Sequence, residues 1–390
     1  FIYGAAGTGK STMINYISSL FKDKQKIFLA NTNPAVENLR RKVTAEHAEF
    51  VTITKFLSKD VSNDCDILCL DECSTISNRD MVRVLQRAQC KLLVLVGDIY
   101  QIESILFGNW FNIAYKVMPK DSVAELTRPH RTTVQGLIEV WNKVREITED
   151  RLEFITRNGL SSTLDESIFS RTEEDEIVLC LNYDGIYGIN NINKFLQSNN
   201  VNPSINWGVL SYKVGDPVLF NESNRFAPLV YNNLKGKILQ IEEEEDCIYF
   251  TIEVYTVLNE LDVIGFDLEL KESVTDETSV IRFKVGRGGD GNDDNDNVEN
   301  VVPFQVAYAI SIHKAQGLEY ESVKVVITSE IEEMVSHNIF YTAITRAKSK
   351  LKIYWSPETE KRILENMKVQ FNDKDYQLFK AKYKEALLKS

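Results

Sequence analysis

The chain opens on a phosphate-binding loop. The pattern G-x-x-x-x-G-K-[ST] is matched without a mismatch by Gly4, Ala5, Ala6, Gly7, Thr8, Gly9, Lys10 and Ser11. Apolar residues just before the loop predict the end of a strand, and Met13–Leu20 has apolar residues at helical spacing. In such a strand–loop–helix context, backbone N–H groups face phosphate oxygens, Lys10 reaches the β- and γ-phosphates, and Ser11 holds Mg²⁺. We therefore expect the chain to bind a nucleotide.

Length and composition limit the classes of protein to which the chain can belong. A length of 390 residues suggests two or three domains, and a hydrophobic content of 43% is enough for each to form a hydrophobic core. No apolar run approaches the roughly 18 residues of a membrane span, and no signal peptide is evident, so we expect no membrane association. Six cysteines at irregular spacing predict no disulfide framework, which favours a reduced, cytoplasmic protein. Because the first residue is Phe and the first strand is short, we expect a larger protein with a fused or associated N-terminal domain.

The net charge of −12 comes from one segment. Residues 241–300 contain 18 Asp and Glu and 4 Lys and Arg, a net charge of −14. Subtracting this from the total leaves +2 for the other 330 residues. The bulk charge therefore neither supports nor excludes a nucleic-acid partner.

Residues 1–130 alternate strand and helix patterns. Lys26–Ala30 predicts a strand and Val36–Val43 a helix. Asp66–Leu70 and Leu92–Val96 are continuous apolar runs, typical of buried parallel strands. The pattern predicts an α/β domain with a parallel sheet.

Further along the chain, this α/β pattern is interrupted by a β-rich segment. Helices are expected at Val134–Ile155 and Asn190–Gln197, and strands at Ile177–Leu181, Cys247–Val257, Val263–Leu270 and Val280–Val285. The strands beyond residue 236 predict a small inserted β-barrel or sheet. Residues 286–300 are almost all Gly, Asn and acidic residues, so we expect a mobile loop there. The α/β pattern returns from Phe304 to Trp355, and two helices are expected within residues 357–390.

Polar residues follow two of the apolar strands. Asp71 and Glu72 come directly after one, at the edge of the sheet where the loop lies. Asp71 can hold Mg²⁺ through water, and Glu72 can polarise the attacking water of a hydrolysis reaction. Gln101, after the other strand, can sense a γ-phosphate or hold a water. Arginines that neutralise the developing charge would complete the site, and the candidates are Arg131 and Arg346.

Taken in order, these motifs resemble those of the superfamily 1B helicases, the RecD-like group of 5′→3′ enzymes. The resemblance runs from residue 4 to about residue 355. Beyond the loop, it rests on residues 71–74, 97–101, 125–131, 309–320 and 340–348. It implies an ATP-hydrolysing helicase or translocase with an α/β fold of two RecA-like P-loop NTPase domains, each with a parallel sheet. ATP and Mg²⁺ would lie between the domains, and single-stranded DNA would lie across both.

The resemblance also implies residue roles. Arg131 and Arg346 would reach the γ-phosphate from the second domain, and Gly317 and Glu319 would contribute to nucleotide binding. The strand contacts would be Thr32, Asn33, Pro34 and Thr54 in the first domain, and Ser311, His313 and Lys314 in the second. Such hydroxyl and amide groups suit phosphate contacts that position a strand without reading its sequence.

The expected domain boundaries follow from the motifs. The first RecA-like domain is expected at residues 1–130, and the second at residues 131–236 and 301–356. Residues 214–218 and 231–236 resemble the strand and turn before the SH3-like domain of RecD-like enzymes. Residues 237–300 would then be that domain in an acidic form, followed at residues 357–390 by C-terminal helices.

Two departures from the family limit the unwinding hypothesis. Only 18 residues separate Asn33 from Thr52, too few for the inserted wedge that such helicases usually carry. Glu103 stands where the family often has proline, and we expect it to face away from the strand. The alternatives are therefore a translocase without much unwinding, an ATP-dependent switch or regulatory module, and an RNA helicase.

Several side chains have both a functional and a structural interpretation. Trp110, Phe111 and Phe56 could stack on bases, but core packing is the more common role of such residues. His313 could contact the strand or pack in the interior. Cys65, Cys69 and Cys73 lack a fourth ligand at suitable spacing, which argues against a zinc or iron–sulfur site.

Overall fold

The computed structural model describes residues 1–58, 62–102, 108–221, 225–227, 229–273, 275–287, 300–368 and 373–387. The chain divides into two compact units. The first consists of Phe1–Ser161, Ser329–Lys352 and Ser356–Ser390, and the second of Ser162–Thr328 and Ile353–Trp355. Among the described residues, no helix combines the length and the apolar character needed to cross a bilayer.

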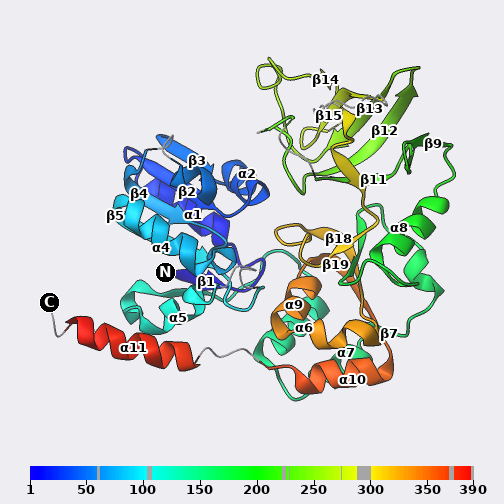
Figure 1. Cartoon of the computed structure of the whole chain (residues 1–390). Coiled ribbons are helices and arrows are strands. Elements are labelled where there is room, and N and C mark those ends of the chain that lie inside the picture. Colours follow the sequence, from blue (N-terminus) through cyan, green and yellow to red (C-terminus); the bar gives the residue numbers. More distant parts are fainter. Residues whose placement is uncertain are drawn as a thin grey trace, which may run out of the picture. The chain divides into compact units, whose positions relative to one another are not determined.

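The first unit is built on a six-stranded parallel sheet with the order β3-β2-β4-β5-β1-β6 (Figure 1). Its strands are β1 (Ile2–Gly4), β2 (Lys26–Ala30), β3 (Ala48–Thr52), β4 (Asp64–Leu70), β5 (Gln89–Gly97) and β6 (Ala124–Leu126). The strands and the parallel sheet predicted for residues 1–130 are therefore confirmed.

Helices cover both faces of this sheet, because successive strand residues point to opposite sides. Along β2, Ile27 and Leu29 join one core and Phe28 and Ala30 the other. One core takes in helices α3 (Ile53–Leu57), α4 (Asn78–Arg87) and α5 (Trp110–Val117). The other takes in α1 (Lys10–Leu20) and α2 (Asn33–Lys42). The result is a three-layer α/β/α arrangement.

The first unit also contains helices from later in the chain. These are α6 (Gln135–Glu146), α7 (Arg151–Arg157), the short 3₁₀ helix η5 (Ser329–Met334), α9 (His337–Ile344), α10 (Pro357–Asn366) and α11 (Asp373–Leu387). The single helix predicted at Val134–Ile155 is wrong. Ile147 adopts a left-handed φ of 52°, which ends α6 and turns the chain into α7. The two C-terminal helices, α10 and α11, are confirmed.

A second parallel sheet lies in the second unit. Its strands β17 (Ala309–Ser311), β8 (Glu176–Cys180) and β18 (Tyr320–Val326) pair in that order, and helix α8 (Ile189–Ser198) packs on them. The Ile327 N–H donates to the Tyr354 carbonyl at 2.9 Å, which ties the end of β19 (Ala347–Tyr354) to this unit.

The predicted β-rich segment is an antiparallel sheet with the order β14-β15-β13-β12-β11-β16. Its strands are β11 (Pro217–Phe220), β12 (Lys235–Glu243), β13 (Cys247–Val254), β14 (Glu269–Lys271), β15 (Ser279–Gly286) and β16 (Phe304–Val306). It therefore begins and ends outside residues 237–300. The strand predicted at Val263–Leu270 is wrong for most of its length, because the chain there forms turns and only β14 pairs with β15.

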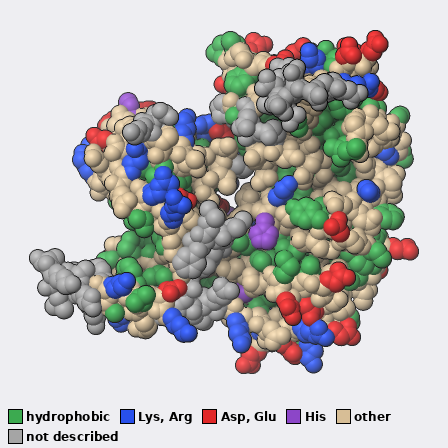
Figure 2. Space-filling view, viewed as in Figure 1, with side chains coloured by type: hydrophobic (Ala, Val, Ile, Leu, Met, Phe, Trp, Pro, Cys, Tyr) green, Lys and Arg blue, Asp and Glu red, His purple; other side chains and the backbone are tan. Residues whose placement is uncertain are grey.

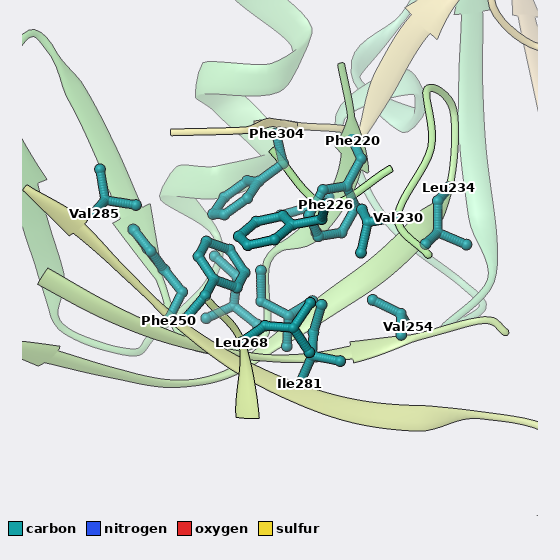
Figure 3. Packing of buried hydrophobic residues seen from close by; sticks show 14 of the residues in the cluster. Phe220, Phe226, Val230, Leu234, Phe250, Val254, Leu268, Ile281, Val285 and Phe304 are labelled. Atoms are coloured by element: carbon teal, nitrogen blue, oxygen red, sulfur yellow. The ribbon is translucent and has the colours of Figure 1, made fainter. Parts of the chain in front are cut away.

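Alternation along β13 explains how an acidic segment folds. Ile248, Phe250, Ile252 and Val254 are fully buried, and they pack against Phe220, Phe226 and Phe304 (Figure 3). The intervening side chains face away from this core, so the sheet can carry acid on its surface. Figure 2 shows acidic side chains gathered over this sheet.

Some predictions concern residues outside the described ranges, and others remain predictions. Glu103 and most of the loop expected at residues 286–300 lie outside the described residues. The SH3-like character of the antiparallel sheet and the exact domain boundaries stay predictions.

Candidate nucleotide site and strand-binding residues

The phosphate-binding loop joins β1 to α1. Gly7 and Gly9 have φ values of +74° and +82°, a left-handed conformation that favours glycine. The Thr8 hydroxyl donates to the Ala5 carbonyl at 2.8 Å, which closes the loop on itself. Helix α1 then begins at Lys10. The amino end of this helix supplies the N–H groups and the positive dipole end that a phosphate needs.

Groups of the chain itself contact this loop. The Lys10 ammonium donates to the carbonyls of Gly4 and Ala5, each at 2.9 Å. The Ala6 N–H donates to the hydroxyl of Tyr341 at 3.4 Å. Since all three of these hydrogen bonds go to neutral acceptors, a phosphate group can replace them without breaking an ion pair.

Buried carboxylates lie beside the loop. Asp71 is only 6% exposed, and burial, with the charge of Glu72, raises its pKa to about 7. Burial likewise raises the pKa of Asp98, and the charge of Lys10 opposes the rise for both aspartates. Glu72 Oε2 and Asp98 Oδ2 are buried, with no hydrogen-bond partner among the described residues. These oxygens can accept hydrogen bonds from the water ligands of Mg²⁺, and the ion prefers oxygen donors such as the Ser11 hydroxyl and the Asp71 carboxylate, so the residues present fit this ion.

The loop after β5 places Gln101 in the same region. Asp98 accepts a hydrogen bond from the Tyr100 N–H at 3.0 Å, which turns the chain back, and Gln101 is only 4% exposed. The Gln101 carbonyl accepts from the Asn338 side chain at 3.0 Å, and the Ile102 N–H donates to the Thr342 hydroxyl at 3.2 Å. Helix α9 therefore contacts this loop.

Of the two predicted arginines, Arg131 lies against the phosphate-binding loop and Arg346 is bonded to helix α9, which contacts that loop. The backbone at Gly7 approaches Arg131 so closely that a Cβ there would lie 2.4 Å from the Arg131 Cβ. The Arg131 guanidinium donates to the Thr345 carbonyl at 2.6 Å. Arg346, 2% exposed, donates to the Thr342 carbonyl at 2.9 Å. The structure thus gathers the loop, Arg131 and Arg346 in one compact unit.

Two further residues of this region were not singled out by sequence reasoning. The Arg145 guanidinium lies over the Tyr100 ring at 5.7 Å, and its charge opposes the rise in the pKa of Asp98. Tyr341 is fully buried, with its ring 6.3 Å from those of both Tyr100 and His337. Arg145 lies in a helix among other charged residues, so the sequence contained no signal for it.

The candidate strand contacts of the first unit lie at the carboxyl ends of neighbouring strands. Thr32 follows β2 and caps α2 by accepting from the Ala35 N–H at 3.4 Å, and Asn33 is exposed beside it. Thr54 is exposed on α3, just after β3. Pro34 lies in the first turn of α2. Because β2 and β3 are parallel neighbours, these residues share one edge of the sheet.

The candidate contacts of the second unit lie just after β17. Ser311 accepts from the Lys314 N–H at 3.2 Å, and the Lys314 ammonium donates to Gln305 at 2.9 Å. His313 is exposed, so its interpretation as a packed interior residue is wrong. Gly317 has a φ of +81°, and the Glu319 carbonyl accepts from Lys235 at 3.1 Å.

The aromatic candidates for base stacking belong mainly to the core. Phe56 and Phe111 are buried in the core that covers one face of the first sheet. Trp110 is half-buried and donates its indole N–H to the Ile76 carbonyl at 2.9 Å. Core packing is therefore confirmed for Phe56 and Phe111.

The three clustered cysteines point in different directions. Cys65 and Cys73 lie in one core of the first unit and Cys69 in the core on the opposite face. Burial raises the pKa of each thiol. Their side chains therefore do not converge on one metal ion.

Family models match both ends of the chain. Residues 1–165 match the AAA domain, and residues 306–354 match the UvrD-like helicase C-terminal domain. Together they cover the phosphate-binding loop, the carboxylates, both arginines and the residues after β17.

Curated relatives are similar at low identity. An uncharacterized protein of Methanocaldococcus jannaschii is 24% identical over 89% of this chain and 36% of its own length. The RecD subunit of the RecBCD enzyme of Mycolicibacterium smegmatis is 22% identical over 78% of this chain and 52% of its own length. The ATP-dependent DNA helicase Pif1 of Campylobacter jejuni is 23% identical over 91% of this chain and 88% of its own length. The chain thus spans about half or less of the length of the first two relatives.

Solved structures share the fold. The Pif1 helicase of Candida albicans matches with a TM-score of 0.57 at 19% identity, over 98% of this chain and 95% of the other. The Pif1 helicase of Bacteroides, in complex with ADP-AlF3 and ssDNA, matches with a TM-score of 0.52 at 17% identity, over 91% and 88%. The predicted fold class, α/β with two RecA-like domains, is confirmed.

Proposed function

Because the chain belongs to the RecD- and Pif1-like group of superfamily 1B helicases, we propose that it hydrolyses ATP to move along single-stranded DNA. One observation carries the proposal. The phosphate-binding loop touches Arg131 at Gly7 and Tyr341 at Ala6, and Tyr341 lies on the helix that leads to Arg346. A phosphate-binding loop against Arg131, in contact with the helix that leads to Arg346, suits phosphoryl transfer, whose transition-state charge arginines stabilise.

Each residue of the site has a proposed role. Lys10 binds the β- and γ-phosphates, and Glu72 polarises the attacking water. Gln101 senses the γ-phosphate from the loop after β5. Arg131 and Arg346 stabilise the charge that develops in the transition state, for which an arginine contributes about 10³–10⁵ in rate.

Mg²⁺ would be held by the Ser11 hydroxyl and, through water, by Asp71. When bound, it neutralises charge on the β- and γ-phosphates. The raised pKa of Asp71 supports this role, because a buried carboxylate that is costly to ionise gains most from a cation.

The strand would be gripped by two sets of residues. Thr32, Asn33, Pro34 and Thr54 contact it in the first unit, and Ser311, His313 and Lys314 in the second. Gly317 and Glu319 would link the second set to the nucleotide. ATP can drive 5′→3′ stepping only through contacts that differ between two states of the protein, and Arg131 and Arg346 are the groups that would make them.

A regulatory ATPase or switch is the second candidate function. The partial coverage of two relatives, 36% and 52% of their own lengths, favours it, since the matched region is one part of each of those proteins. A switch needs the nucleotide residues but has no use for an exposed His313 or for Ser311 and Lys314 beside it. An RNA track is the other alternative, since only the 2′-hydroxyl distinguishes the two strands.

Strand displacement separates these candidates. Labelled duplexes with a single-stranded tail at either the 5′ or the 3′ end, made in DNA and in RNA, are incubated with the chain and ATP. We expect displacement of the DNA duplex with the 5′ tail, and none with the Glu72→Gln variant. A translocase without unwinding would displace streptavidin from a biotinylated strand end instead. If neither displacement occurs with any strand, the motor function is wrong.

A further inference from the structure

We infer that helix α9 clamps the loop after β5 at two backbone points, through Asn338 and Thr342, and so positions Gln101 relative to Arg346. Both are positioning residues, since neither is placed to touch the nucleotide. This inference rests on the proposed ATPase function and deepens it, because it names the groups that fix the γ-phosphate sensor.

The two contacts are adjacent along the loop. The Asn338 amide donates to the Gln101 carbonyl at 3.0 Å, and the Thr342 hydroxyl accepts from the Ile102 N–H at 3.2 Å. Asn338 and Thr342 are four residues apart on α9, so they lie on the same face of the helix. One helix face therefore holds both polar atoms of a single peptide group, the one that joins Gln101 to Ile102.

Burial makes these bonds hard to replace with water. Thr342 is fully buried, and Gln101 and Ile102 are 4% and 8% exposed. A buried backbone N–H that loses its partner costs free energy comparable to a lost hydrogen bond. The loop is therefore expected to keep its position only while Thr342 and Asn338 hold it.

The same helix contacts the rest of the site. Tyr341, next to Thr342, accepts from the Ala6 N–H of the phosphate-binding loop. The Thr342 carbonyl accepts from the Arg346 Nε at 2.9 Å. Thr342 thus bonds the sensor loop through its side chain and the arginine through its backbone. The position of Gln101 and that of Arg346 are linked through this one residue.

The test compares substitutions that differ by one hydroxyl. Thr342→Val keeps the shape of the side chain but removes the acceptor, and Thr342→Ser keeps the acceptor. We expect Thr342→Val to lower the strand-stimulated kcat of ATP hydrolysis roughly three- to tenfold with the KM for ATP unchanged, the loss that one hydrogen bond explains. Thr342→Ser should retain the wild-type kcat. Asn338→Ala, at a half-buried position, should show the same kcat loss without a large change in Tm.

A double-mutant cycle with Gln101→Ala separates positioning from general damage. If the clamp acts through Gln101, Thr342→Val should have little further effect once the Gln101 side chain is gone. Equal losses in both backgrounds, or a Ser variant as impaired as the Val variant, would overturn the clamp while leaving the ATPase function in place. A wild-type protein without ATP turnover would overturn both, and the two failures are therefore distinguishable.

Discussion

Replacing Asp71 by asparagine should stabilise the protein while destroying its activity. In the folded chain, burial and the charge of Glu72 raise the pKa of Asp71 from 3.8 to about 7. A difference of about 3 pH units, at about 1.36 kcal/mol per unit, means that ionising this carboxyl costs at most about 4 kcal/mol of folding free energy. Asparagine keeps the oxygen that accepts from the Glu72 N–H at 2.9 Å, and it removes the charge.

The sign of the pH dependence follows from the raised pKa. Below about pH 4, Asp71 is protonated in both states and the variant gains nothing. Between about pH 4 and 7 the folded state binds a proton that the unfolded state lacks, so wild-type stability falls as pH rises. Above pH 7 the full cost is present, and the advantage of Asp71→Asn is then largest.

Calorimetric unfolding from pH 4 to pH 8.5, in a chelator and without nucleotide, measures this advantage. We expect the Tm of Asp71→Asn to exceed that of the wild type by several degrees at pH 8, since about 1 kcal/mol shifts Tm by roughly 2–4 °C in a unit of this size. Asp66→Asn is the matched control on the same strand. Its carboxylate accepts from Lys91 at 2.6 Å, which lowers its pKa, so this variant should gain no stability at pH 8. An Asp71→Asn variant that is no more stable than wild type, or an advantage that does not grow with pH, would refute the reasoning.

Three further substitutions test the site and the fold. Gly7→Ala should abolish the binding of a fluorescent ATP analogue, because the new Cβ would lie 2.4 Å from the Arg131 Cβ and the backbone φ is +74°. Gly136→Ala is the control and should bind the analogue normally, since the new Cβ would have no atom within 4 Å. Arg346→Ala should lower the kcat of ATP hydrolysis by about 10³ or more, with a much smaller effect on nucleotide affinity in the same titration. Phe250→Ala should lower the free energy of unfolding in urea by about 3–5 kcal/mol, because Phe250 is fully buried with its ring 5.0 Å from that of Phe304. A loss below about 1 kcal/mol would contradict this packing.

The parts of the fold that were predictable are those with a strong local signal. The loop at Gly4–Ser11 has a fixed spacing, and β4 and β5 each end in a short continuous apolar run that is typical of a buried parallel strand. The helix predicted at Val134–Ile155 failed because its apolar spacing continues across Ile147, where the backbone turns left-handed. Val263–Leu270 has strand-like composition but lies in turns, since a partner strand is decided by tertiary pairing.

The candidate residues could be named from the sequence, but the contacts among them could not. Glu72, Gln101 and Arg346 could each be named from a motif. No sequence pattern indicated that Asn338 and Thr342 form hydrogen bonds with the backbone at Gln101 and Ile102. The C=O and N–H groups that they contact are present at nearly every position, so the sequence does not show which of them will be partners. Arg145 was missed for a similar reason, since its place over Tyr100 depends on how α6 packs.

The most direct test of the central proposal is the rate of ATP hydrolysis with and without single-stranded DNA. The protein is titrated with oligo-dT at low salt, and the titration is repeated at several salt concentrations. We expect saturable stimulation whose half-maximal concentration rises with salt, because phosphate contacts release counterions, and no turnover in Glu72→Gln. A rate that is the same with and without saturating oligonucleotide would contradict the proposal that ATP hydrolysis at this site is coupled to a nucleic-acid strand.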